Sequence, residues 1–126
     1  MLRTLVTGAA ALGLCGTAAF AQDYTAEPSY GSVTLNSGFT PDPYTVDLQS
    51  GGSIDAQSRL GGSCRGYIAN APDFSVNYSS GSLPLILSVN ASADTALVVN
   101  GPDGEFYCDD DSGSGLNPSL RFERPS

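Results

Sequence analysis

The segment DTALVVNGPDGEFYCDDDSG, residues 94–113, carries the clearest structural signal in this sequence. An apolar run at Ala96–Val99 enters Asn-Gly-Pro-Asp-Gly, a set of turn-forming residues that strongly favours reversal of the chain. A second short run follows at Glu105–Cys108. The segment therefore predicts a β-hairpin that brings a cysteine and an acidic loop to one end of a sheet.

The rest of the chain repeats this pattern of short apolar runs between turn-forming clusters. Helical periodicity is nearly absent after residue 21, and the spacing is typical of an all-β fold. We predict a small antiparallel β-sandwich of the jelly-roll type, built as one domain from residues 22–126. The expected strands are Ser32–Leu35, Tyr44–Leu48, Cys64–Ala69, Phe74–Tyr78, Leu83–Val89, Thr95–Asn100, Glu105–Cys108 and Leu120–Glu123.

Two of these expected strands lie in similar surroundings. Pro41–Leu48 (PDPYTVDL) resembles Ala71–Tyr78 (APDFSVNY) at an offset of 30 residues. The similarity has two interpretations, a true duplication or the common chemistry of a strand between two turns. We favour the second, because any turn followed by a half-buried strand produces such a pattern.

The first 21 residues have the pattern of a secretory signal peptide. Arg3 supplies the positive region, Leu5–Leu14 the apolar region, and Ala19-Phe20-Ala21 the cleavage signal. Lipidation at Cys15 is disfavoured because a large residue, Leu14, precedes it. We expect a mature chain that starts at Gln22, is not membrane-embedded, and is periplasmic or secreted from a bacterium.

Beyond Cys15 the chain contains two cysteines, Cys64 and Cys108. An even pair in an oxidising compartment predicts a disulfide. The closed loop of about 45 residues would stabilise the fold by about 4 kcal/mol on the chain-entropy model. Two free thiols, or two ligands of a metal, are the alternatives.

The charge and the residue types exclude several functions. The net charge is −8, whereas nucleic acids require clustered Lys and Arg on their protein partners. The sequence has no histidine, and its five basic residues are all arginines. Neither a Ser-His-Asp nor a Ser-Lys mechanism can be assembled from it. We therefore predict no catalytic residues and no enzyme activity, with a carboxylate-dependent hydrolase as the least favoured alternative.

One cluster has the chemistry of a binding site. Asp109, Asp110, Asp111 and Asn117 offer the oxygen ligands that calcium prefers, although an EF-hand is excluded because Leu120 stands where its glutamate should be. The alternative, which we favour, is a solvated turn whose carboxylates bond to the loop's own backbone. Calcium is the single cofactor that the sequence suggests.

The second half of the chain resembles the bacterial pre-peptidase C-terminal (PPC) domain. The motifs are Asp94-Thr95-Ala96-Leu97, then Pro102-Asp103-Gly104, then Asp109–Gly113 in the same order. Cys64–Ile68 and Ala71–Phe74 also resemble a subgroup of exported bacterial proteins that sometimes bear a serine-peptidase label. The resemblance covers roughly residues 64–126. The family's closing Gly-x-Tyr strand has no counterpart after Leu120–Ser126, so a last strand missing at the C-terminus is expected.

The resemblance implies a small non-catalytic β-sandwich attached to an exported enzyme. Domains of this family accompany secreted peptidases, and some bind extracellular polymers or calcium. We therefore expect an exported accessory domain that binds an extracellular polymer or a protein partner. The alternative is a truncated accessory domain of a secreted serine peptidase.

Overall fold

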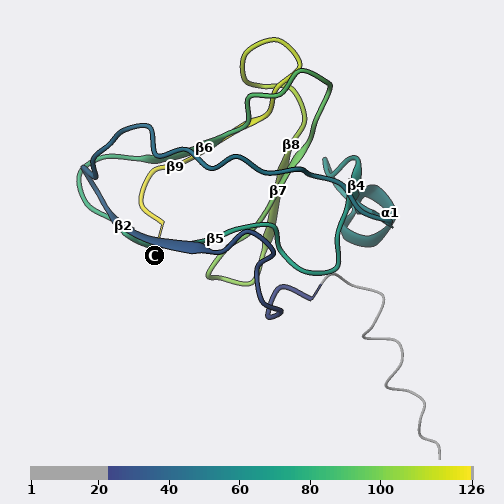
Figure 1. Ribbon diagram of the computed structural model, residues 1–126, viewed down its shortest axis with the longest axis horizontal. Helices are drawn as coiled ribbons and strands as arrows, with labels where there is room; N and C mark the ends of the chain where they lie inside the picture. The colour runs from purple at the N-terminus through teal and green to yellow at the C-terminus, as the bar shows by residue number, and fades with distance from the viewer. Residues whose placement is uncertain (1–22, 126) are drawn as a thin grey trace, which may run out of the picture.

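The computed structural model describes residues 23–125 of the chain. The predicted signal peptide, its cleavage site and Cys15 lie outside these residues. The all-β prediction is confirmed, because eight short strands and one short helix make up the regular structure of the described part (Figure 1). The elements are β2 (Ser32–Asn36), β3 (Ile54–Asp55), α1 (Ala56–Leu60), β4 (Tyr67–Ile68), β5 (Ser75–Ser79), β6 (Leu85–Ser88), β7 (Leu97–Asn100), β8 (Phe106–Asp109) and β9 (Ser119–Phe122).

The strands pair two by two. β3 pairs with β4, β6 with β9, and β7 with β8, all antiparallel as the predicted sandwich requires. The fourth pair, β2 with β5, runs parallel and differs from that prediction. Its register sets Val33 against Val76 and Leu35 against Tyr78, so the half-buried side chains of both strands lie on one face. Matching of these two apolar stripes explains the pairing of strands so distant in sequence.

The predicted β7–β8 hairpin is confirmed. Leu97 pairs with Asp109 at the open end and Asn100 with Phe106 at the turn. The turn is closed by the Gly104 N–H, which donates to the Gly101 carbonyl oxygen at 3.0 Å. Gly104 has a φ of 86°, a left-handed conformation that favours glycine. The local sequence Asn-Gly-Pro-Asp-Gly thus accounts for the whole reversal.

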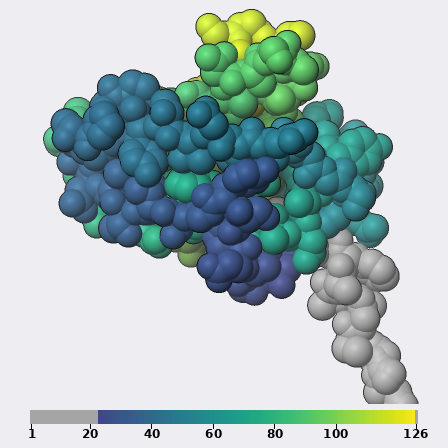
Figure 2. All heavy atoms as spheres, in the orientation of Figure 1, coloured from purple at the N-terminus to yellow at the C-terminus, as the bar shows by residue number. Residues whose placement is uncertain are grey.

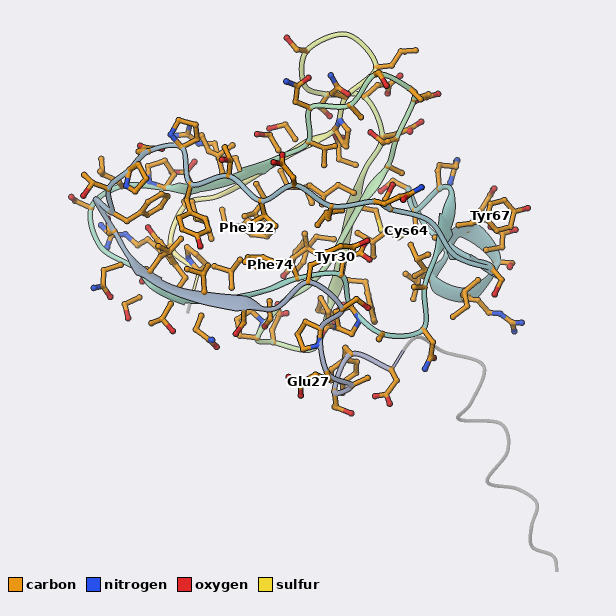
Figure 3. All side chains as sticks on the ribbon, in the orientation of Figure 1. Glu27, Tyr30, Cys64, Tyr67, Phe74 and Phe122 are labelled. Atoms are coloured by element: carbon orange, nitrogen blue, oxygen red, sulfur yellow. A yellow bond between two sulfur atoms is a disulfide. The ribbon has the colours of Figure 1, made fainter. Side chains whose placement is uncertain are left out.

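β9 joins the hairpin to β6. Leu120 of β9 pairs with Leu87, and Phe122 pairs with Leu85, which is buried. The Phe122 ring also meets the Tyr107 ring of β8 edge to face, with centroids 5.3 Å apart. Figure 3 shows Phe122 near the middle of the molecule.

Few side chains are fully enclosed in this fold. Among the described residues, the buried ones are Ala56, Cys64, Leu85 and Pro118. Nine large apolar side chains are exposed instead: Tyr24, Tyr30, Tyr44, Val46, Leu48, Tyr67, Leu83, Ile86 and Leu116. A core of this size contributes little hydrophobic free energy, so covalent cross-linking carries more of the stability than in an ordinary domain of this length.

One predicted strand is absent, and two short elements are present that the sequence did not predict. Tyr44–Leu48 has the alternation of a strand, but it pairs with no other segment of residues 23–125. The helix α1 and the short strand β3 were not predicted. Asp55 begins the helix, since its side chain accepts a hydrogen bond from the Gln57 N–H at 3.0 Å. A helix of five residues is too short to show a periodic signal.

Candidate functional site

The acidic loop joins β8 to β9 at the end of the molecule drawn uppermost in Figure 1. Asp109, its first acidic residue, is still part of β8 and pairs with Leu97. Asn117 stands at the other end of the loop, just before the buried Pro118. The four predicted ligands therefore lie on the loop between β8 and β9 or at its two ends.

Asp109 is bound by its own loop. One carboxylate oxygen accepts hydrogen bonds from the Ser112 N–H at 3.0 Å and the Ser119 N–H at 2.8 Å. The other accepts a short hydrogen bond from the Ser112 hydroxyl. The Ser112 hydroxyl bond, and next the Ser119 backbone bond, lower the pKa of Asp109 below its usual range. The carboxylate thus fastens the end of β8 to the start of β9.

The rest of the loop is closed in the same way. The Asn117 side-chain oxygen accepts from the Ala91 N–H at 3.1 Å, which ties the loop to the segment after β6. The Gly113 N–H donates to the Asn117 carbonyl oxygen at 2.8 Å. A Cβ at Gly113 would lie 2.7 Å from that oxygen, so this close approach requires glycine. The backbone and the two end residues already account for the loop's shape.

The four predicted ligands do not share one centre of coordination. Asp109 and Asn117 use their oxygens for backbone donors, and Asp111 is exposed and accepts no hydrogen bond from another described residue. Within residues 23–125 there is no group of three or more Asp, Glu, Cys or His side chains that could hold a metal ion. The geometry supports the hydrogen-bonded turn, and calcium binding stays a prediction.

Replacing Asp109 by alanine is expected to destabilise the fold by about 2 kcal/mol, because three hydrogen-bond donors lose their acceptor. Asp111→Ala, an exposed carboxylate of the same loop, is the matched control and should leave the free energy of unfolding nearly unchanged. Urea unfolding at pH 7 measures both. Equal effects from the two substitutions would contradict the role given to Asp109.

The hydrogen bonds to the Asp109 carboxylate also make the free energy of unfolding depend on pH. A carboxyl whose pKa is lowered on folding contributes its full stabilisation above its unfolded value, about 3.9, and loses it as the pH falls through the lower folded value. The difference in stability between the native chain and Asp109→Ala should therefore shrink below about pH 4. Urea unfolding repeated from pH 7 to pH 2 measures this difference.

Calcium binding has its own test. If the loop binds the ion, calcium at one hundred times its Kd raises the free energy of unfolding by about 2.7 kcal/mol, and magnesium raises it less. We expect equal, small effects of the two ions, because they only screen clustered carboxylates. Thermal melting in each ion at equal ionic strength separates the outcomes. A calcium-specific shift that Asp111→Ala abolishes would establish the site.

A second polar pair lies at the opposite end of β8. The Tyr107 hydroxyl donates to Asp103 at 2.5 Å, and the Glu105 N–H donates to the same carboxylate at 3.0 Å. The Tyr107 bond lowers the pKa of Asp103, and the same bond raises the pKa of Tyr107. The sequence identified Asp103 as a turn residue but not its bond to Tyr107, because only the hairpin register brings the two side chains together.

The predicted disulfide is present. Cys64 and Cys108 are bonded, with Cα atoms 4.9 Å apart. Cys64 is buried and lies between α1 and β4 (Figure 3). Cys108 lies in β8 opposite Val98. The bond therefore fastens the α1–β4 unit to the hairpin, and the alternatives of free thiols or a metal pair are overturned.

A small pocket lies outside every site that the sequence predicted. Its volume is about 110 Å³. Its lining residues include two aromatic rings and one carboxylate: Gly38, Phe39, Asp42, Tyr78, Leu83, Pro84, Leu85 and Ile86. Its lining comes from the segment after β2, the end of β5 and the start of β6. The sequence pattern of Phe39 and Asp42, an aromatic and a carboxylate near two prolines, indicates only a turn, so sequence reasoning missed the pocket.

The residues described contain no helix that is both long and apolar enough to span a bilayer. No family model, curated protein or solved structure matches this chain. The resemblance to the PPC domain is therefore a hypothesis that stands on the motifs of residues 64–126 alone.

Proposed function

We propose that this chain is an exported, non-catalytic β domain that binds an extracellular protein partner. One observation carries the assignment to an exported domain: the Cys64–Cys108 disulfide joins two halves of a fold that has very few buried side chains. Such a fold suits an oxidising compartment, where the cross-link persists. The N-terminal sequence, with its signal-peptide pattern, supports the same compartment.

The binding role rests on the surface. The described residues expose aromatic and aliphatic side chains on several elements, among them Tyr67 beside α1, which is 64% exposed and points outward in Figure 3. Tyrosine is among the residues enriched at the centre of protein–protein interfaces. The absence of histidine and lysine from the sequence supports a non-catalytic role.

Export is tested by producing the full chain in a bacterium that has a periplasm. The periplasmic product should begin at Gln22, and its two remaining cysteines should resist alkylation until a reductant is added. Intact-mass spectrometry before and after alkylation measures both properties. A chain that keeps Met1, or one whose Cys64 and Cys108 react without reduction, would refute the proposal.

A further inference from the structure

The segment after β2 is an exposed run of chain whose first part makes no backbone hydrogen bond with the rest of the described chain. All residues from Pro41 to Ser53 are exposed, and none belongs to a helix or to a strand. No backbone hydrogen bond of the described chain involves residues 41–48. Figure 2 shows this blue segment stretched across the face of the molecule. Its peptide groups are therefore open to a partner, as at the edge of a sheet.

The contact at Gln49 indicates which way these groups point. The Gln49 N–H donates to the Tyr30 hydroxyl at 3.3 Å, and the same hydroxyl donates to the Gln49 carbonyl oxygen at 3.2 Å. In an extended chain the N–H and C=O of one residue point to one side, and those of the next residue to the other. Counted back from Gln49 along an extended chain, Thr45 falls on the side of Tyr30 and Val46 on the opposite side, so we expect the Val46 peptide groups to form the open edge.

Within this segment, apolar and polar side chains alternate from Tyr44 to Leu48. Tyr44, Val46 and Leu48 alternate with polar residues, and they are 43%, 37% and 40% exposed. Pro43 directly precedes this stretch and lacks an N–H, so it limits strand pairing at the N-terminal end. A strand added here would pair over five residues, Tyr44–Leu48, and would present apolar side chains at every second position.

The negative charge around Tyr44–Leu48 favours a positively charged partner. The chain carries a net charge of −8; Asp47 lies within Tyr44–Leu48, and Asp42 lies two residues before it. A second copy would bring the same negative charge to the contact. A strand pair of five residues also buries much less surface than a stable dimer does. A peptide rich in Lys or Arg is attracted instead, both at a distance and at contact.

The pocket beside this edge suits a basic side chain. Asp42 lines it, two residues before Tyr44, and its carboxylate has no hydrogen bond or ion pair in the described part of the chain. Phe39 and Tyr78 supply aromatic walls. The aliphatic stem of a Lys or Arg packs on such walls while its cationic head meets a carboxylate or an aromatic face.

We propose that Tyr44–Leu48 is a docking edge for an extended peptide of a partner protein in which apolar side chains alternate with Lys or Arg. The peptide adds as a β-strand along the open edge, and one of its basic side chains enters the pocket beside Asp42. This inference rests on the proposed binding function, for which it names the surface and the chemical class of the partner.

The test uses the exported, disulfide-bonded chain and a fluorescein-labelled peptide that alternates Lys and Val over seven residues. Fluorescence anisotropy should show saturable binding at low salt that weakens as salt rises. A peptide with Glu in place of Lys should not bind. A peptide of the original sequence with N-methyl groups on alternate residues should bind about ten-fold more weakly, because it cannot complete the backbone hydrogen bonds.

Two matched pairs of protein variants locate the site. Val46→Pro removes an N–H from the open edge and should weaken binding about ten-fold, whereas Thr45→Pro, on the Tyr30 side, should not. Asp42→Asn should weaken binding about three-fold and reduce its salt dependence, whereas Asp111→Asn on the β8–β9 loop should do neither. Neither proline replaces an N–H that is bonded in the structure, so both variants should melt like the native chain.

The outcomes separate the inference from the function on which it rests. No binding of the Lys-Val peptide, equal binding to Val46→Pro, or a dimer in sedimentation that Val46→Pro dissociates would each overturn the docking edge. None of these results would change the N-terminus or the protection of the cysteines, which test export. Loss of those two properties would refute the proposed function, whatever the peptide does.

Discussion

Replacing both Cys64 and Cys108 by alanine is expected to destabilise the protein by about 4 kcal/mol, since the bond closes a loop between residues 44 positions apart. The cross-link restricts the unfolded chain, and its loss also removes the buried Cys64 side chain from a very small core. In a domain of about 100 residues this corresponds to a fall of about 20 °C in Tm. Calorimetry of the native and double-alanine chains measures it.

The control for this prediction is chemical. Dithiothreitol should lower the Tm of the native chain toward that of the double-alanine variant and should leave the variant unchanged. Ser63→Ala, which removes only a 3.5 Å hydrogen bond to the Cys108 carbonyl oxygen, should shift the Tm little. If the double-alanine chain melted within a few degrees of the native one, the fold would depend on packing rather than on the cross-link.

Gly52→Ala is expected to destabilise the protein by about 3 kcal/mol, the upper range for a forced backbone shift. A Cβ at this position would overlap the backbone carbon and oxygen of Ile68 and the nitrogen of Ala69. Ile68 belongs to β4 and pairs with Ile54 of β3. The methyl group therefore has space only if β4 moves away and this pair is broken.

Ser53→Ala is the matched control, because Ser53 is the exposed neighbour of Gly52 and lies on the same run of chain. It should unfold at the same urea concentration as the native protein. Hydrogen exchange at the amides of Ile54 and Ile68 should accelerate in Gly52→Ala alone. An unchanged exchange rate at these two amides would show that the close approach of Gly52 to β4 does not constrain the fold.

The local chemistry of the chain determined several features without help from the fold. The β7–β8 hairpin follows from Asn100–Gly104, since the turn residues and the two flanking runs are adjacent in sequence. The disulfide follows from the even cysteine pair. The turn interpretation of the loop after Asp109 follows from side chains that bond to backbone donors a few residues away. In the hairpin and in the loop, the interacting residues are close in sequence. For the disulfide, each cysteine has only one possible partner after residue 21.

The hydrogen bond from Ser119 to Asp109 shows where local reasoning ends. The sequence places Asp109 in a turn, yet its bond to Ser119 depends on where β9 meets β6 and β8. The same holds for Gly52 and Ile68, whose close approach no residue pattern announces. The pocket beside Asp42 joins three segments that are remote in sequence.

The two similar segments, Pro41–Leu48 and Ala71–Tyr78, show most clearly what the sequence determines and what the tertiary structure determines. Both have the alternation of a half-buried strand, but only the second contains one, β5, because Val76 and Tyr78 find Val33 and Leu35 of β2. Tyr44–Leu48 has the same local pattern and no partner strand among the described residues. Sequence alternation determines that a segment can form a strand. Whether it does depends on a second strand in register, and only the tertiary structure supplies that strand.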